Sequence, residues 1–198
     1  MAEALIPRLE TDRLLLREWQ PADREPFARI NADPRVVEFL SRPLDRAGSD
    51  DMVDRIEARW RADGHGLWAV ERRADGTFIG FVGLAAATFE AAFTPCVEIG
   101  WRLAHAAWGQ GYATEAARAA LRFGFDALGL DEIVSFTVPA NVRSRAVMAR
   151  LGMTRDPADD FDLPSLAAGH DLRRHVMYRL GRDRWRGAAR PGAPGPGG

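Results

Sequence analysis

The segment HAAWGQGYATEA, residues 105–116, places two glycines in a turn directly before an alanine-rich helical segment. Helices usually begin with a Ser, Thr, Asp or Asn cap, which this turn does not offer. Gly109 and Gly111 have no Cβ, so bare backbone N–H groups come close to the helix N-terminus. The unpaired donors and partial positive charge of a helix N-terminus favour phosphate. The segment therefore predicts a strand–turn–helix unit that binds a phosphate-bearing ligand, with a plain tight turn as the alternative.

Two common phosphate-binding motifs do not fit this turn. A Walker loop needs a Lys after its last glycine, and all 27 basic residues of this chain are arginine. A Rossmann fingerprint needs a further Gly or Ala where the chain has Thr114. A ligand other than a P-loop nucleotide or a dinucleotide is therefore expected.

The hydrophobic pattern predicts a single domain over residues 1–186 of the mixed α/β class. Strands are expected at residues 13–19, 66–71, 77–84, 96–104, 132–138 and 173–180. Helices are expected from Pro21 to Asn31, where DPRV ends the helix, and at 49–64, 114–130 and 141–153. Ser49 is the expected cap of the second helix, and Asp75-Gly76 the expected hairpin turn. The sheet should be antiparallel early and parallel around residues 97–138.

Composition limits the classes of function. The formal net charge of −1 predicts neither a nucleic-acid nor a membrane partner. The N-terminus lacks the apolar stretch of a signal peptide, and a cytoplasmic location is expected. Cys96 is the only cysteine and the four histidines have no ligand spacing, so no metal is expected. Residues 187–198 contain eight Gly or Pro residues and are expected to be a disordered tail.

A second segment, NVRSRAVMARLGM at residues 141–153, follows about thirty residues after the glycine turn. Asn141 lies between a predicted strand and a predicted helix, where its side chain can cap the helix or bind an amide-bearing ligand. Ser144, Val147, Met148 and Leu151 then share one helical face.

Three segments in order, TDRLLLREWQPADREPF, EIGWRLAHAAWGQGYATEA and NVRSRAVMARLGM followed by HVMYRL, resemble the GNAT superfamily of N-acetyltransferases, and within it the RimJ/RimL-like branch. The resemblance covers most of residues 8–181. It implies a twisted mixed sheet of about seven strands with helices on both faces and splayed fourth and fifth strands. It also implies acetyl-CoA as co-substrate, with the pantetheine arm along the fourth strand and the pyrophosphate on the glycine turn. The cofactor-binding residues so implied are Trp101, Leu103, Ala104, Trp108, Gly109, Gln110, Gly111, Tyr112, Ala113, Thr114, Asn141, Ser144 and Met148.

The chain departs from the family pattern at two positions. Trp108 stands where Gln or Arg is usual, a change that leaves the backbone chemistry of the loop intact and is common in the RimJ/RimL-like branch. Met148 stands where many members have a tyrosine general acid, so another proton donor is needed. Ser144 is a candidate donor, with helix capping as its alternative role. Glu98 is a candidate acceptor of the amine proton, with a structural carboxylate as its alternative.

The expected function is direct transfer of an acetyl group from acetyl-CoA to a primary amine, either a protein N-terminus or a small molecule. The alternative is a non-catalytic acyl-CoA-binding sensor or interaction module, which the absent tyrosine favours. A homodimer is left open. The acidic loop at residues 156–171 would suit a cationic acceptor, although a solvated acidic loop is the simpler interpretation.

Overall fold

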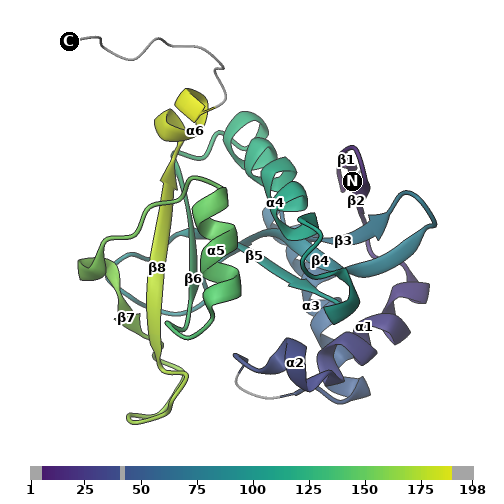
Figure 1. Ribbon diagram of the computed structural model, residues 1–198, viewed down its shortest axis with the longest axis horizontal. Helices are drawn as coiled ribbons and strands as arrows, with labels where there is room; N and C mark the ends of the chain where they lie inside the picture. The colour runs from purple at the N-terminus through teal and green to yellow at the C-terminus, as the bar shows by residue number, and fades with distance from the viewer. Residues whose placement is uncertain (1–5, 41–42, 189–198) are drawn as a thin grey trace.

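The computed structural model describes residues 6–40 and 43–188, and a single mixed sheet forms its centre (Figure 1). The strand order is β1-β2-β3-β4-β5-β6-β8-β7. The strands are β1 (Leu9–Glu10), β2 (Leu14–Arg17), β3 (Leu67–Arg72), β4 (Thr77–Ala86), β5 (Val97–Leu103), β6 (Glu132–Thr137), β7 (Phe161–Asp162) and β8 (Arg174–Gly181). All neighbours are antiparallel except β5 and β6, which are parallel. The mixed sheet is confirmed. It has eight strands where about seven were expected, and β1 and β7 have only two residues each, too few to show a pattern in the sequence.

The sheet opens between β5 and β6, the fourth and fifth of the predicted strands. β4 and β5 pair from Gly80 with Leu103 to Ala86 with Val97, without interruption. β5 and β6 share one register pair, Glu98 with Val134. The rest of β5 therefore presents a backbone edge that β6 does not occupy.

Helices cover both faces of this sheet. They are α1 (Arg24–Ala32), α2 (Pro34–Val37), α3 (Arg46–Asp63), α4 (Tyr112–Arg122), α5 (Val142–Arg150) and α6 (Arg182–Ala188), and a π-helical segment (Phe123–Ala127) continues α4. In Figure 1, α4 and α5 lie in front of the sheet and α3 lies behind it.

Side-chain alternation along the strands sets the two faces. A Cβ at Gly124, just after α4, would lie 2.9 Å from Cδ1 of Leu84 on β4, so α4 packs on the Leu84 face. On the opposite face, the ring of Phe81 lies 5.9 Å from that of Phe27 on α1. Because Leu84 pairs with Ile99, the side chains of Glu98 and Arg102 lie on the α1 and α3 face, and Gly100 lies between them on that face.

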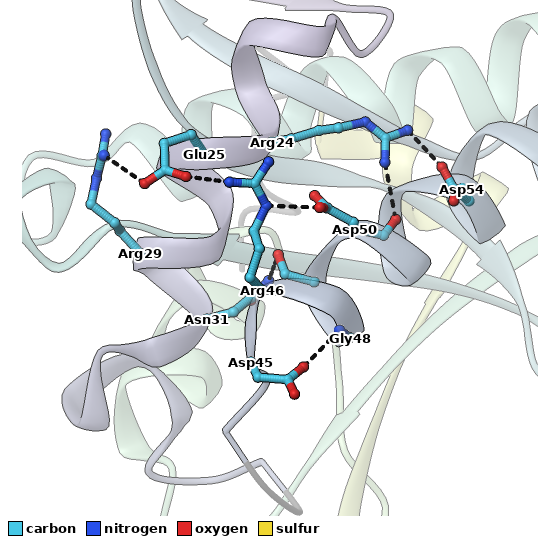
Figure 2. A network of polar contacts seen from close by, with 10 residues as sticks. Arg24, Glu25, Arg29, Asn31, Asp45, Arg46, Gly48, Asp50 and Asp54 are labelled. Atoms are coloured by element: carbon cyan, nitrogen blue, oxygen red, sulfur yellow. Dashed lines mark hydrogen bonds and ion pairs between the residues drawn. The ribbon is translucent and has the colours of Figure 1, made fainter.

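Ion pairs join α1 to α3. Arg24 pairs with Asp54 at 2.6 Å, and Arg46 bridges Glu25 and Asp50 (Figure 2). Beneath them, Asn31 donates to the Ser49 hydroxyl at 2.9 Å, and both side chains are fully buried. This contact corrects the prediction for α3, whose cap is Asp45, accepting from the Gly48 N–H at 2.8 Å. Ser49 lies inside the helix because burial against Asn31 outweighs its local preference for a cap.

Other boundaries also differ from the predictions. DPRV ends α1, but it also starts α2, with Asp33 accepting from the Arg35 N–H at 3.0 Å. The left-handed Gly64 ends α3 as predicted. The predicted tail begins two residues too early, because α6 continues to Ala188, and the remainder of that tail lies outside the described residues.

Candidate active site

The glycine turn adopts the backbone conformation that its sequence requires. Gly109 and Gly111 have φ angles of 73° and 81°, in the left-handed region where side chains are strained. Gly111 is the N-cap of α4, and no side chain of the described residues caps this helix. The first N–H groups of α4 are therefore available to a ligand anion.

An arginine from the start of the chain holds this turn in place. Arg13 Nη1 donates to the Gln110 carbonyl at 3.0 Å, and its Nε donates to Glu115 at 2.7 Å. The Thr11 hydroxyl donates to the other Glu115 oxygen at 2.6 Å. Burial of Glu115 raises its pKa, but the bonds from Thr11 and Arg13 outweigh this and leave the pKa below its ordinary value. The carboxylate therefore stays charged and fixes the first turn of α4 against the N-terminal segment.

A cavity of about 1350 Å³ lies over the turn and the open edge of β5. Ten of the predicted cofactor-binding residues line it: Trp101, Leu103, Trp108, Gly109, Gly111, Tyr112, Ala113, Thr114, Asn141 and Ser144. The structure thus gathers segments about forty residues apart in the chain into one concave surface.

Arginines dominate the charged lining of this cavity. They are Arg13, Arg35, Arg102, Arg118, Arg122, Arg143 and Arg150, against the acidic Glu10, Asp12 and Glu115. Arg118 and Arg122 on α4 and Arg150 on α5 are exposed. The sequence reasoning missed them, although the four-residue spacing of Arg118 and Arg122 places both on one helical face. This excess of positive charge suits a ligand with several phosphates.

The backbone of β5 offers fewer groups than predicted. Successive strand residues direct their N–H and C=O groups to alternate edges. The Ala104 N–H donates to the Ile79 carbonyl on the β4 side at 2.9 Å, so it points away from the open edge. Trp101 and Leu103 face the open edge, although the Leu103 carbonyl accepts from the Trp108 indole at 2.9 Å. The prediction for Ala104 is therefore wrong for its backbone amide.

Two further predicted contacts are not among the cavity-lining residues. Met148 is 1% exposed and packs in the core, because its position on α5 faces the sheet. The Gln110 side chain folds back and donates to the Ala106 carbonyl at 2.9 Å. The structure gives no support to a side-chain role for either residue in cofactor binding.

Asn141 and Ser144 lie together at the start of α5. Asn141 Oδ1 accepts from the Ser144 N–H at 3.1 Å, and its Nδ2 donates to Thr137 at 3.0 Å. Asn141 is therefore the helix cap, one of its two predicted roles, and it also lines the cavity. Ser144 is partly buried and lines the same cavity.

Glu98 does not line this cavity, but it lies on β5 where β6 begins to part from it. Its side chain is partly buried on the α1 and α3 face, and burial raises the pKa of its carboxyl to about 8. A carboxyl with such a pKa can accept a proton from an ammonium group near neutral pH.

The sequence pattern did not predict an aromatic cluster that lies on the α1 and α3 face of the sheet. Its members are Phe89, Phe93, Phe136, Phe161 and His175, with ring centroids 4.7–6.0 Å apart. Phe136 lies two residues after Val134, the register partner of Glu98. The cluster brings four separate segments together, which no local pattern shows.

The remaining features singled out in the sequence are Cys96 and the acidic loop at residues 156–171. Burial raises the pKa of the Cys96 thiol, which disfavours a reactive thiolate. In the acidic loop, Asp159 pairs with Arg179 at 2.7 Å and Asp162 with Arg173 at 3.3 Å. Asp160 pairs with Arg155. These pairs neutralise most of the charge that would attract a cationic acceptor.

Neither a membrane span nor a metal cluster is present in the described parts of the chain. No described helix is long and apolar enough to cross a membrane. Within the described ranges, no group of three His, Cys, Asp or Glu side chains is placed to hold a metal ion.

A mixed sheet opened beside an uncapped helix N-terminus, with an arginine-rich cavity above it, defines a protein whose site suits a ligand with several phosphates. Residues 13–154 match the acetyltransferase (GNAT) domain, and the chain belongs to this family. It is 30% identical over 191 residues to the FsC-acetyl coenzyme A-N(2)-transacetylase of Aspergillus fumigatus, covering 90% of this chain and 78% of that protein.

Solved structures agree with this assignment. An acetyltransferase from Agrobacterium tumefaciens is 32% identical, with a TM-score of 0.71 over 88% of this chain and 94% of the other. A ribosomal-protein-S5-alanine acetyltransferase from Vibrio fischeri shares the fold, with a TM-score of 0.70 at 16% identity over 90% and 98% of the chains. The chain is therefore an acetyltransferase, and acetyl-CoA is the co-substrate of its family.

Proposed function

We propose that this protein transfers the acetyl group of acetyl-CoA directly to a primary amine, and that it belongs to the RimJ/RimL-like branch. The observation that carries the proposal is the uncapped N-terminus of α4, which opens into the arginine-lined cavity. The N–H groups from Gly111 to Thr114 would hold the pyrophosphate, and the exposed arginines would hold the remaining phosphate charge. The open edge at Trp101 and Leu103 would pair with the pantetheine amides.

Acetyl-CoA supplies the acetyl group as a thioester when bound. Glu98 accepts a proton from the ammonium form of the acceptor, directly or through water, so that the amine lone pair can form the new C–N bond. As the C–N bond forms, the nitrogen loses its second proton to water. The C–S bond breaks, and the Ser144 hydroxyl supplies a proton to the departing sulfur and regains one from water. Met148 plays no part in proton transfer, because a thioether has no proton to give.

Two measurements test this proposal. Calorimetric titration should show that CoA binds, and thiol release from acetyl-CoA should require a primary amine. CoA carried through purification and detected by mass spectrometry would add support. Binding without turnover for any amine would favour the non-catalytic acyl-CoA-binding module, and absence of binding would overturn the proposal.

A further inference from the structure

Arg102 on β5 is a charged side chain that the proposed mechanism does not use. It is partly buried on the α1 and α3 face, with its guanidinium carbon 5.5 Å from the centre of the Phe81 ring. Its Nη1 lies 3.6 Å from the Met52 sulfur. Burial lowers the pKa of Arg102 to about 10, so the group stays charged at neutral pH.

The contrast with Arg17 shows what a structural arginine looks like in this fold. Arg17 is buried and pairs with Asp23 at 2.7 Å and with Glu71 at 2.8 Å. Among the residues that the structure describes, no carboxylate lies within ion-pair distance of Arg102. A guanidinium held in such surroundings without a carboxylate partner is costly.

The described contacts of Arg102 involve Nη1 of its guanidinium and leave Nε and Nη2 available to hydrogen-bond a ligand. Nη1 donates to Asn31 Oδ1 at 2.6 Å, and Asn31 is held in turn by Ser49 beneath the α1–α3 ion pairs (Figure 2). No hydrogen bond from Nε or Nη2 of Arg102 is present within the described ranges. An arginine has five N–H donors in a planar fork that matches a carboxylate.

A bare strip of strand separates Arg102 from Glu98. Both side chains lie on one face of β5, with Gly100 between them at two-residue spacing. A Cβ at Gly100 would meet nothing within 4 Å. Arg102 also lines the arginine-rich cavity. The strand therefore presents a carboxyl, an open gap and a guanidinium in succession. At the backbone, Gly100 lies about 7 Å from Glu98 and about 7 Å from Arg102.

We propose that Arg102 binds a carboxylate of the acceptor, so that the substrate is a small primary amine carrying a carboxylate group a few bonds from its nitrogen. This rests on the proposed acetyl transfer beside Glu98, since that carboxyl marks where the amine reacts. The internal neutralisation of the acidic loop agrees with an acceptor that is not purely cationic.

Matched pairs of acids and amides test the assignment. The probes are glycine, 3-aminopropanoate, 4-aminobutanoate and 6-aminohexanoate, each compared with its primary amide by thiol release from acetyl-CoA. At the length that fits, the acid should exceed the amide in kcat/KM by roughly ten- to hundredfold, as expected for a charge-assisted pair. Equal values for acid and amide at every length would overturn the assignment.

Three variants separate recognition from folding. Arg102→Gln keeps a donor toward Asn31 but loses the charge, so the preference for the acid should fall to within about twofold. Its KM for the acid should rise far more than its kcat falls, and its KM for acetyl-CoA should not change. Arg102→Lys should retain part of the preference. Arg55→Gln, at an exposed position of α3, is the control and should match the wild type.

Calorimetric binding of the acids to the CoA-loaded protein distinguishes this proposal from the proposed function. Acid binding that depends on Arg102, without turnover, supports the Arg102 assignment and overturns acetyl transfer. Turnover without an acid preference, or a preference that survives in Arg102→Gln, overturns the assignment alone. If no acid binds or reacts, the assignment is wrong. It is also wrong if Arg102→Gln weakens acetyl-CoA binding instead, which would make Arg102 a phosphate ligand of the donor.

Discussion

Replacing Glu98 by glutamine should remove the rise of activity with pH. With a pKa of about 8, roughly one tenth of this carboxyl is ionised at pH 7 and half at pH 8. If the ionised form accepts the amine proton, wild-type kcat/KM should rise about fivefold over that interval and level off above pH 9. The kcat/KM of Glu98→Gln should lose this rise with pH, and at the plateau it should be roughly 10²- to 10⁴-fold lower than that of the wild type.

The same carboxyl should make the stability of the fold depend on pH. Its pKa is raised from the ordinary 4.5 in the unfolded chain to about 8 in the folded protein. Between these values the folded state binds the proton more tightly, so stability is highest below pH 4.5 with respect to this group and falls as pH rises to 8. At roughly 1.4 kcal/mol per pH unit, the loss is at most about 5 kcal/mol, and Glu98→Gln should abolish it.

Two assays check these values. Thiol release with one good acceptor, measured from pH 6 to 9.5, gives the kcat/KM profile, and chemical denaturation at pH 6 and pH 9 gives the free energy of unfolding. An acceptor of known amine pKa allows the ionisation of the amine to be factored out. A wild-type profile that is flat after this correction, or a limb retained by Glu98→Gln, would refute the role of Glu98 as the proton acceptor.

Three other substitutions probe the donor side. Gly111→Val should weaken CoA binding at least roughly tenfold, because the added side chain stands before the amides of α4. Gly64→Val, also in the left-handed region but remote from the cavity, is the matched control, and equal CoA affinity in the two variants would count against the site. Asn141→Ala should cost about 1 kcal/mol of stability through the lost cap, and it should raise the activation free energy of turnover by more than that. Unfolding of the variant, with normal activity in the protein that stays folded, would make Asn141 purely structural. Ser144→Ala should lower kcat by roughly 10²- to 10⁴-fold with little change in the KM for acetyl-CoA, and a normal kcat would leave water as the proton source.

Local sequence signals determined several turns of this protein and the cap of α5. The left-handed glycines 64, 109 and 111 lie where the pattern requires them, and Asn141 caps α5 as its position between strand and helix indicates. Such features depend on backbone dihedral preferences and on neighbours within four residues. The left-handed glycines of the turn and the start of α4 without a side-chain cap could therefore be predicted before any tertiary contact was known.

Only the tertiary structure decided which side chains meet across the fold. Arg102 reaches Asn31, 71 residues earlier in the chain, and Ser49 leaves its predicted capping role to hold that asparagine. Met148 lies in the core, and the Ala104 amide turns toward β4, because strand register and helix packing set those directions. The raised pKa of Glu98 likewise depends on what surrounds the carboxyl in the folded protein. Register and burial arise from contacts between distant segments, and those contacts leave no periodic pattern in the sequence.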